Sequence, residues 1–77
     1  MRGALLMRRF PATDGAMWDA IVGHESWGTF VVLFSPVAGG AARKVILAGE
    51  TALAAETELD AKTDDDLREL LSQSSPW

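Results

Sequence analysis

The chain has 77 residues, of which 48% are hydrophobic and 23% are charged, a composition that indicates one globular domain and excludes a disordered chain. It has no cysteine and one histidine, which excludes a disulfide framework and leaves no ligand set for a four-ligand zinc site. Its net charge of −4 disfavours nucleic-acid binding over the whole surface. A domain of this size without disulfides gains stability from association, so the composition favours a homo-oligomer.

The N-terminal residues combine arginines with a short apolar stretch at residues 4–7. A signal peptide needs an apolar region of about 7–15 residues, and a membrane-spanning helix needs about 20. Neither pattern occurs, so we expect a soluble, cytoplasmic protein without membrane insertion. Met7 can serve as an alternative start, which would make residues 1–6 a flexible or dispensable extension.

The first half of the chain has the pattern of β-strands. Asp14-Gly15 supplies the positive φ of a tight hairpin turn, the polar residues 23–26 indicate a connection, and Pro36 ends a strand because it cannot donate to the ladder. Between these signals, four segments have strand composition or period-two alternation and predict strands: residues 5–10, 16–22, 27–35 and 43–48.

The second half has the pattern of two short helices. Thr51 can cap a helix over residues 51–60, and Thr63 with Asp66 forms a near capping box that starts a second helix. Residues 73–77 are predicted to be a tail. Strands followed by helices indicate an α+β fold, so we expect one domain over residues 1–77: a four-stranded antiparallel β-meander followed by two short C-terminal helices packed on one sheet face.

The most informative stretch is residues 29–34, Thr-Phe-Val-Val-Leu-Phe, because it places large apolar side chains on both faces of its strand. The leucines at residues 53–71 are enough to cover one face, and a chain this short seldom covers both. We therefore expect a protein partner or a second copy of the chain to cover the second face. The sequence leaves open which of the two faces the partner covers. The candidate interface residues come from both faces and from the last residue of the chain: Phe30, Val31, Val32, Leu33, Phe34, Val45, Ile46 and Trp77.

Four basic residues give an alternative function. Arg8, Arg9, Arg43 and Lys44 would form a stripe for phosphate contacts if the first and fourth strands lay near each other, and this favours a small nucleic-acid-binding module. Charges on edge strands also prevent edge-to-edge aggregation, and that role explains the same residues with fewer assumptions.

The polar segment that contains His24, Glu25 and Ser26 is the most site-like part of the chain, but it completes no catalytic motif. Position 24 is His where a G-x-S-x-G nucleophile elbow needs Gly, and position 28 is Gly where an H-E-x-x-H zinc motif needs His. We therefore expect no enzyme, no catalytic residue, no metal site and no cofactor. The expected function is a non-catalytic protein-interaction module or accessory subunit, acting as a homodimer or within a larger assembly.

Overall fold

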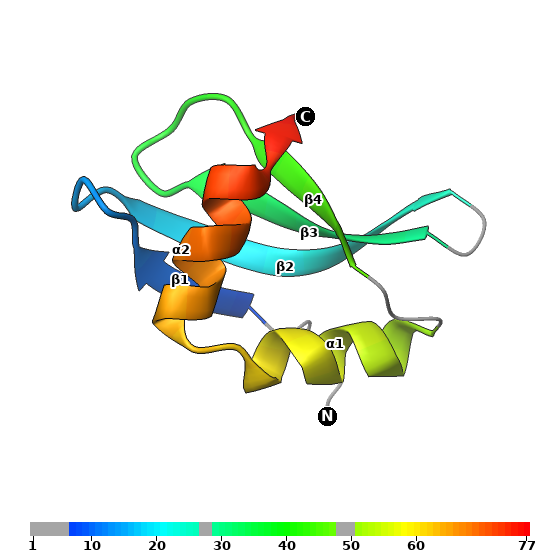
Figure 1. Cartoon of the computed structure of the whole chain (residues 1–77). Coiled ribbons are helices and arrows are strands. Elements are labelled where there is room, and N and C mark those ends of the chain that lie inside the picture. The colour runs from blue at the N-terminus through cyan, green and yellow to red at the C-terminus, as the bar shows by residue number, and fades with distance from the viewer. Residues whose placement is uncertain (1–6, 27–28, 48–50) are drawn as a thin grey trace.

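The computed structural model describes residues 7–26, 29–47 and 51–77 (Figure 1). The predicted extension at residues 1–6 and the first residues of the predicted first strand lie outside the described residues. In chain order, the described elements are β1 (Met7–Pro11), β2 (Met17–Ser26), β3 (Thr29–Pro36), β4 (Arg43–Leu47), α1 (Ala52–Ala61), α2 (Asp64–Gln73) and β5 (Ser75–Pro76).

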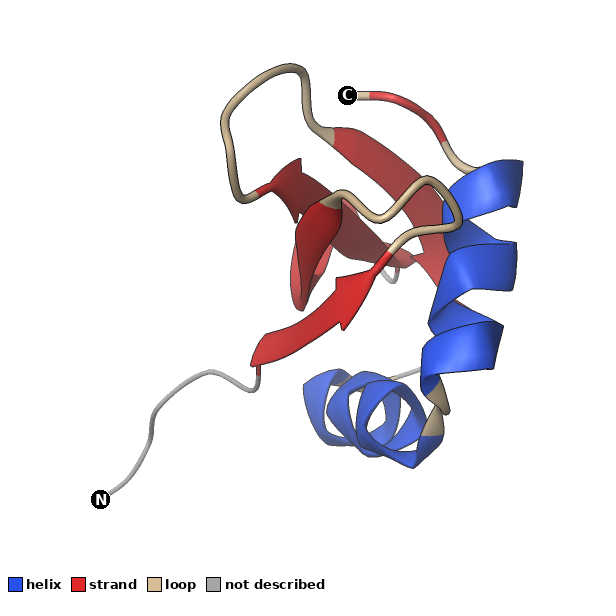
Figure 2. Cartoon of the chain, turned by 90° about the vertical axis from the view of Figure 1, so that its left-hand side faces the viewer, coloured by secondary structure: helices blue, strands red, loops and turns tan. Residues whose placement is uncertain are grey.

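The strands form one antiparallel sheet in the order β1-β2-β3-β4-β5, so each strand pairs with its neighbours in the sequence. Both helices pack on the same face: α1 contacts β2 and β3, while α2 contacts β1 and β4 (Figures 1 and 2). The predicted α+β meander with two C-terminal helices on one sheet face is confirmed. The short β5 adds a strand that the sequence does not reveal.

The core lies between this face and the helices. Phe10 and Phe34 are both fully buried, with their rings edge to face at a centroid separation of 5.9 Å. Leu59 of α1 and Leu67 of α2 are also fully buried in this cluster. The remaining buried members of the cluster are Ala20, Phe30, Val32, Leu47 and Ala55.

The connection predicted at residues 23–26 is wrong, because β2 continues to Ser26. Gly23 and His24 pair with Val31 and Phe30, and the register shifts only between His24 and Ser26. The imidazole of His24 stacks on the Phe30 ring at a centroid distance of 4.8 Å. The polar composition of this segment suggested a loop. It forms a strand because its main-chain groups pair with those of β3, whose apolar residues continue to Phe30.

The tail predicted at residues 73–77 is also wrong. Ser74 ends α2 and is buried, with an exposed fraction of 7%. Arg43 holds it in place, since its Nε donates to the Ser74 hydroxyl at 2.8 Å and its Nη2 to the Ser74 carbonyl at 2.6 Å. The chain then pairs with β4 as β5, and the Trp77 N–H donates to the Ala42 carbonyl at 2.9 Å. Long-range bonds of this kind order a polar segment that has no periodic pattern of its own.

The N-terminus of α2 has the predicted capping box in full. The Asp66 N–H donates to the Thr63 hydroxyl and the Thr63 N–H donates to the Asp66 carboxylate, each at 3.1 Å. The bond from the Thr63 N–H is the main reason that the pKa of Asp66 lies below its usual value of 3.8, and the Thr63 hydroxyl adds to this effect. The box therefore prefers the ionised carboxylate.

We expect the Asp66→Asn variant to melt at a lower temperature than the native chain at neutral pH. Because the pKa of Asp66 is lowered in the folded state, its contribution to stability is complete above the usual pKa of 3.8 and is lost as the pH falls through the folded-state pKa. The difference in melting temperature between the two chains should therefore shrink in acid. Thermal melts of both chains, followed by circular dichroism from neutral pH to acid, measure this difference. A difference in melting temperature that stays constant at every pH would contradict this role for the Asp66 charge.

Candidate functional site

The open face, which we define as the sheet surface opposite the helices, carries an apolar patch. The register places Met7, Ile21 and Leu33 side by side across β1, β2 and β3, on this face. The next row across the sheet contains Val31 and Ile46. Met7 is 52% exposed and Ile46 is 69% exposed, while Ile21 and Leu33 are half-buried.

Gly23 shapes the middle of this patch. A Cβ at Gly23 would lie 2.7 Å from Leu33 Cδ1 and 3.4 Å from Val31 Cγ2. The side chains of Leu33 and Val31 therefore occupy the space above the Gly23 backbone. A larger residue at position 23 would need that space for its own side chain. The Val31 side chain, which packs over Gly23, has no exposed surface. The patch is thus a closely packed surface with exposed side chains on its outer strands.

The structure separates the candidate interface residues into two groups. Phe30, Val32 and Phe34 lie on the helix side and are buried in the core, where Val45 packs against them. Phe30, Val32 and Phe34 are therefore covered within the chain, whereas Val45 is only half-buried. Of the other candidates, Val31 lies on the open face but is fully buried. Leu33, Ile46 and Trp77 retain surface, as Val45 does on the helix side.

Two residues of the open face, Met7 and Ile21, are missing from the sequence-based candidates. Alternation places Ile21 on one face of its strand, but only the strand order and register bring it between Met7 and Leu33. Hydrophobic alternation in β1 and β2 was the available signal. It could not show which of the two faces the helices cover.

The open face has polar borders. On one side, Arg9 and Asp19 form a two-point ion pair, with Nε to Oδ1 at 2.7 Å and Nη2 to Oδ2 at 3.1 Å. The Arg9 side chain hydrogen bond is the main cause that lowers the pKa of Asp19, and the same bond raises the pKa of Arg9. On the other side, the Lys44 ammonium lies 5.1 Å from the centre of the Trp77 ring, which is 65% exposed.

Arg8 lies on the helix side of the sheet and binds the end of α1. Its Nη1 donates to the carbonyls of Leu59 at 3.0 Å, Asp60 at 3.2 Å and Lys62 at 2.7 Å. Its Nη2 lies 3.4 Å from the Asp64 carboxylate at the start of α2. The last carbonyls of a helix lack partners inside the helix and carry partial negative charge, so a guanidinium suits them. Arg8 therefore joins β1 to the junction of the two helices.

The four basic candidates do not gather into one stripe. β1 and β4 are separated by β2 and β3, so Arg8 and Arg9 lie far along the sheet from Arg43 and Lys44. Arg8 and Arg43 point to the helix side, whereas Arg9 and Lys44 are on the open face. Nucleic-acid binding through these residues stays a prediction, and the geometry does not add support to it.

The described residues hold no gathering of three or more His, Asp or Glu side chains that could bind a metal ion. Within the same parts of the chain, no helix is long and apolar enough to cross a bilayer. No protein-family model matches the chain, and no curated protein or solved structure matches it either.

Proposed function

We propose that this protein is a non-catalytic interaction module or accessory subunit that binds another protein chain through the open face. That chain is a second copy or a subunit of a larger assembly. The observation that supports the proposal is the exposed apolar patch formed by Met7, Ile21, Leu33 and Ile46, on the face that neither helix covers.

The surroundings of the patch fit this role. Protein interfaces have an apolar centre and a polar border, and here the Arg9–Asp19 pair and Lys44 flank the apolar side chains. Burying apolar surface contributes about 25 cal/mol per Å². A small domain that buries little surface on its own therefore gains both affinity and stability when a partner covers this face.

We expect the Met7→Lys variant to weaken association about tenfold or more, because the new ammonium would be buried without a partner at the interface. The matched control is Leu53→Lys on α1, since Leu53 is 77% exposed and does not belong to the open face. Size-exclusion chromatography with light scattering measures self-association of the purified chains. For a larger assembly, the measurement is whether the same partner co-purifies with the native chain and the control but not with Met7→Lys.

Two results would contradict the proposal. The first is a monomer at high concentration that binds no apolar dye and brings no partner with it. The second is an equal effect of Met7→Lys and Leu53→Lys. A monomer that binds single- or double-stranded nucleic acid with steep salt dependence would instead favour the alternative function.

A further inference from the structure

The main chain of Ile46 faces away from the sheet at the edge of β4. In a strand, the N–H and C=O of one residue point to the same side, and consecutive residues alternate. Because the Ala42 carbonyl accepts the Trp77 N–H, the main chain of Ala42 faces β5, and those of Lys44 and Ile46 follow on the same side. β5 pairs with Arg43 and Lys44 only. The N–H and C=O of Ile46 therefore point outward beyond the start of β5.

Prolines occupy other outward-facing positions at the edges of the sheet. Because the Trp77 N–H points toward β4, the main chain of the preceding residue, Pro76, points away from β4. Proline has no N–H that could pair with a further strand. At the opposite edge, Pro11 likewise has no N–H, and its carbonyl accepts from Arg68 Nε at 2.8 Å. Proline on an edge strand prevents the addition of further strands. Ile46 keeps both a donor and an acceptor. By the same alternation Met7 and Arg9 keep theirs at the β1 edge, but Ile46 also lies beside a groove.

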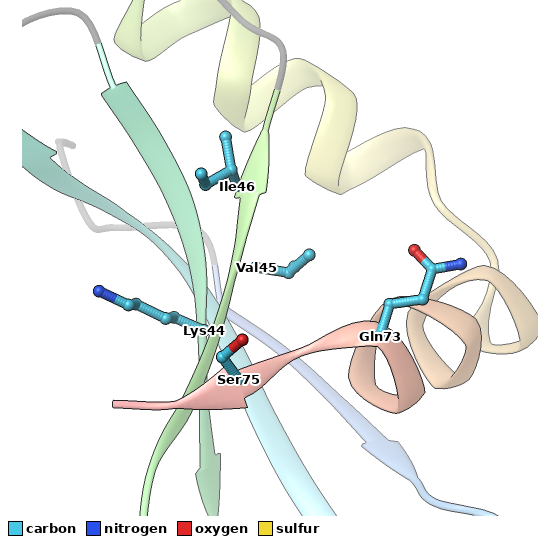
Figure 3. Close-up of a pocket in the computed structure, with 5 residues that line it drawn as sticks. All are labelled: Lys44, Val45, Ile46, Gln73 and Ser75. Atoms are coloured by element: carbon cyan, nitrogen blue, oxygen red, sulfur yellow. The ribbon is translucent and has the colours of Figure 1, made fainter.

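A groove of about 450 Å³ lies along this stretch of the β4 edge (Figure 3). Figure 3 shows the Val45 side chain on the side of α2, with the side chains of Lys44 and Ile46 on the other side of the strand. Gln73 at the end of α2 and Ser75 at the start of β5 complete the lining. The groove thus combines a strand edge with two apolar side chains, two uncharged polar side chains and the charged Lys44.

We infer that this groove binds an extended peptide segment of a partner protein, which adds to β4 as a strand. The peptide would exchange two main-chain hydrogen bonds with Ile46, in the place that β5 leaves empty. Main-chain pairing supplies affinity in this mode, and pockets for alternate side chains supply specificity. The peptide residue opposite Ile46 lies beside it on the open face, and the residues before and after it point toward Val45 and Gln73. The hydrogen bonds of this site come from the edge of β4 and do not involve Met7, although the Ile46 side chain also belongs to the open face.

The test uses a phage-displayed library of random octapeptides selected on the full chain. We expect enriched peptides that shift the backbone amide resonances of residues 44–47 and 73–75. Ile46→Pro removes the outward N–H without touching the β3–β4 ladder, because the ladder bonds belong to the neighbouring residues. Ile46→Thr is the matched control, since it shortens the side chain and keeps the N–H. Loss of one hydrogen bond should make binding to Ile46→Pro about 3- to 10-fold weaker than binding to Ile46→Thr.

A scan of N-methyl groups along the enriched peptide gives a second measurement that does not depend on the folding of any variant. Strand addition predicts a period of two: methylation weakens binding at the residue opposite Ile46 and leaves binding unchanged at its immediate neighbours. Met7→Lys should also leave peptide binding unchanged. The inference is overturned if no peptide is enriched, if methylation has no alternation, or if the peptides lose binding to Met7→Lys rather than to Ile46→Pro.

Discussion

The Phe34→Ala variant is expected to lose about 3–5 kcal/mol of unfolding free energy, because truncating a buried aromatic ring removes its burial and leaves a cavity. Phe34 is fully buried on the central strand β3, and it packs against Phe10 and the two helices. Domains of this length are stable by about 4–12 kcal/mol in total. The variant should therefore keep only part of the native stability, and its urea unfolding midpoint should lie well below that of the native chain.

Urea unfolding at 25 °C, followed by circular dichroism, measures this loss. Leu53→Ala is the matched control, because Leu53 belongs to α1 but is 77% exposed. Its effect should stay within about 0.5 kcal/mol. Equal losses for the two variants would mean that the apolar face of the sheet does not pack against the helices as described.

The Arg8→Ala variant is expected to lose about 1.5–3 kcal/mol, the usual range for hydrogen bonds to a charged group. Its guanidinium satisfies three carbonyls at the end of α1 and contacts Asp64 of α2, and its side chain is only 22% exposed. Removing it leaves these carbonyls without a donor and frees the helix junction from β1. Arg8→Lys should recover part of the loss, since an ammonium keeps the charge but not the planar set of donors.

Arg9→Ala is the control for this experiment because Arg9 is the next residue and its ion pair with Asp19 is exposed. We expect a clearly smaller change in stability from it, since exposed ion pairs contribute little. Thermal and urea unfolding of the three variants are the measurements. A loss for Arg9→Ala that equals the loss for Arg8→Ala would contradict this role, because the contacts of Arg8 at the helix junction would then contribute no more than an exposed ion pair.

The fold class was readable from the sequence because its signals are local. Asp14-Gly15 marks the first hairpin, and Gly15 has the expected positive φ of 89°. The capping box at Thr63 and Asp66 marks the start of α2, and the alternation of residues 29–34 divides β3 correctly into two faces. Each of these depends on residues that are close in the chain.

The parts that failed depend on residues that are distant in the chain. Arg43 orders Ser74 from 31 positions away, and Arg8 reaches the carbonyl of Lys62 over 54 positions. No spacing rule connects such pairs, so residues 73–77 were predicted to be a tail and the arginines were predicted to contact phosphates. The same limit applies to the candidate site, because the choice between its two faces depends on where the helices pack.

The position of the helices after the strands has a consequence for biosynthesis. Strands β1 to β4 leave the ribosome before α1 and α2 do, and each of them pairs with its neighbour in the sequence, so the meander can assemble early. Until residues 52–73 emerge, both surfaces of that nascent sheet expose apolar side chains. At synthesis rates of about 5–20 residues per second, this interval lasts on the order of seconds. Apolar surface that is exposed during this time favours aggregation, and a partner that binds the nascent sheet would reduce it.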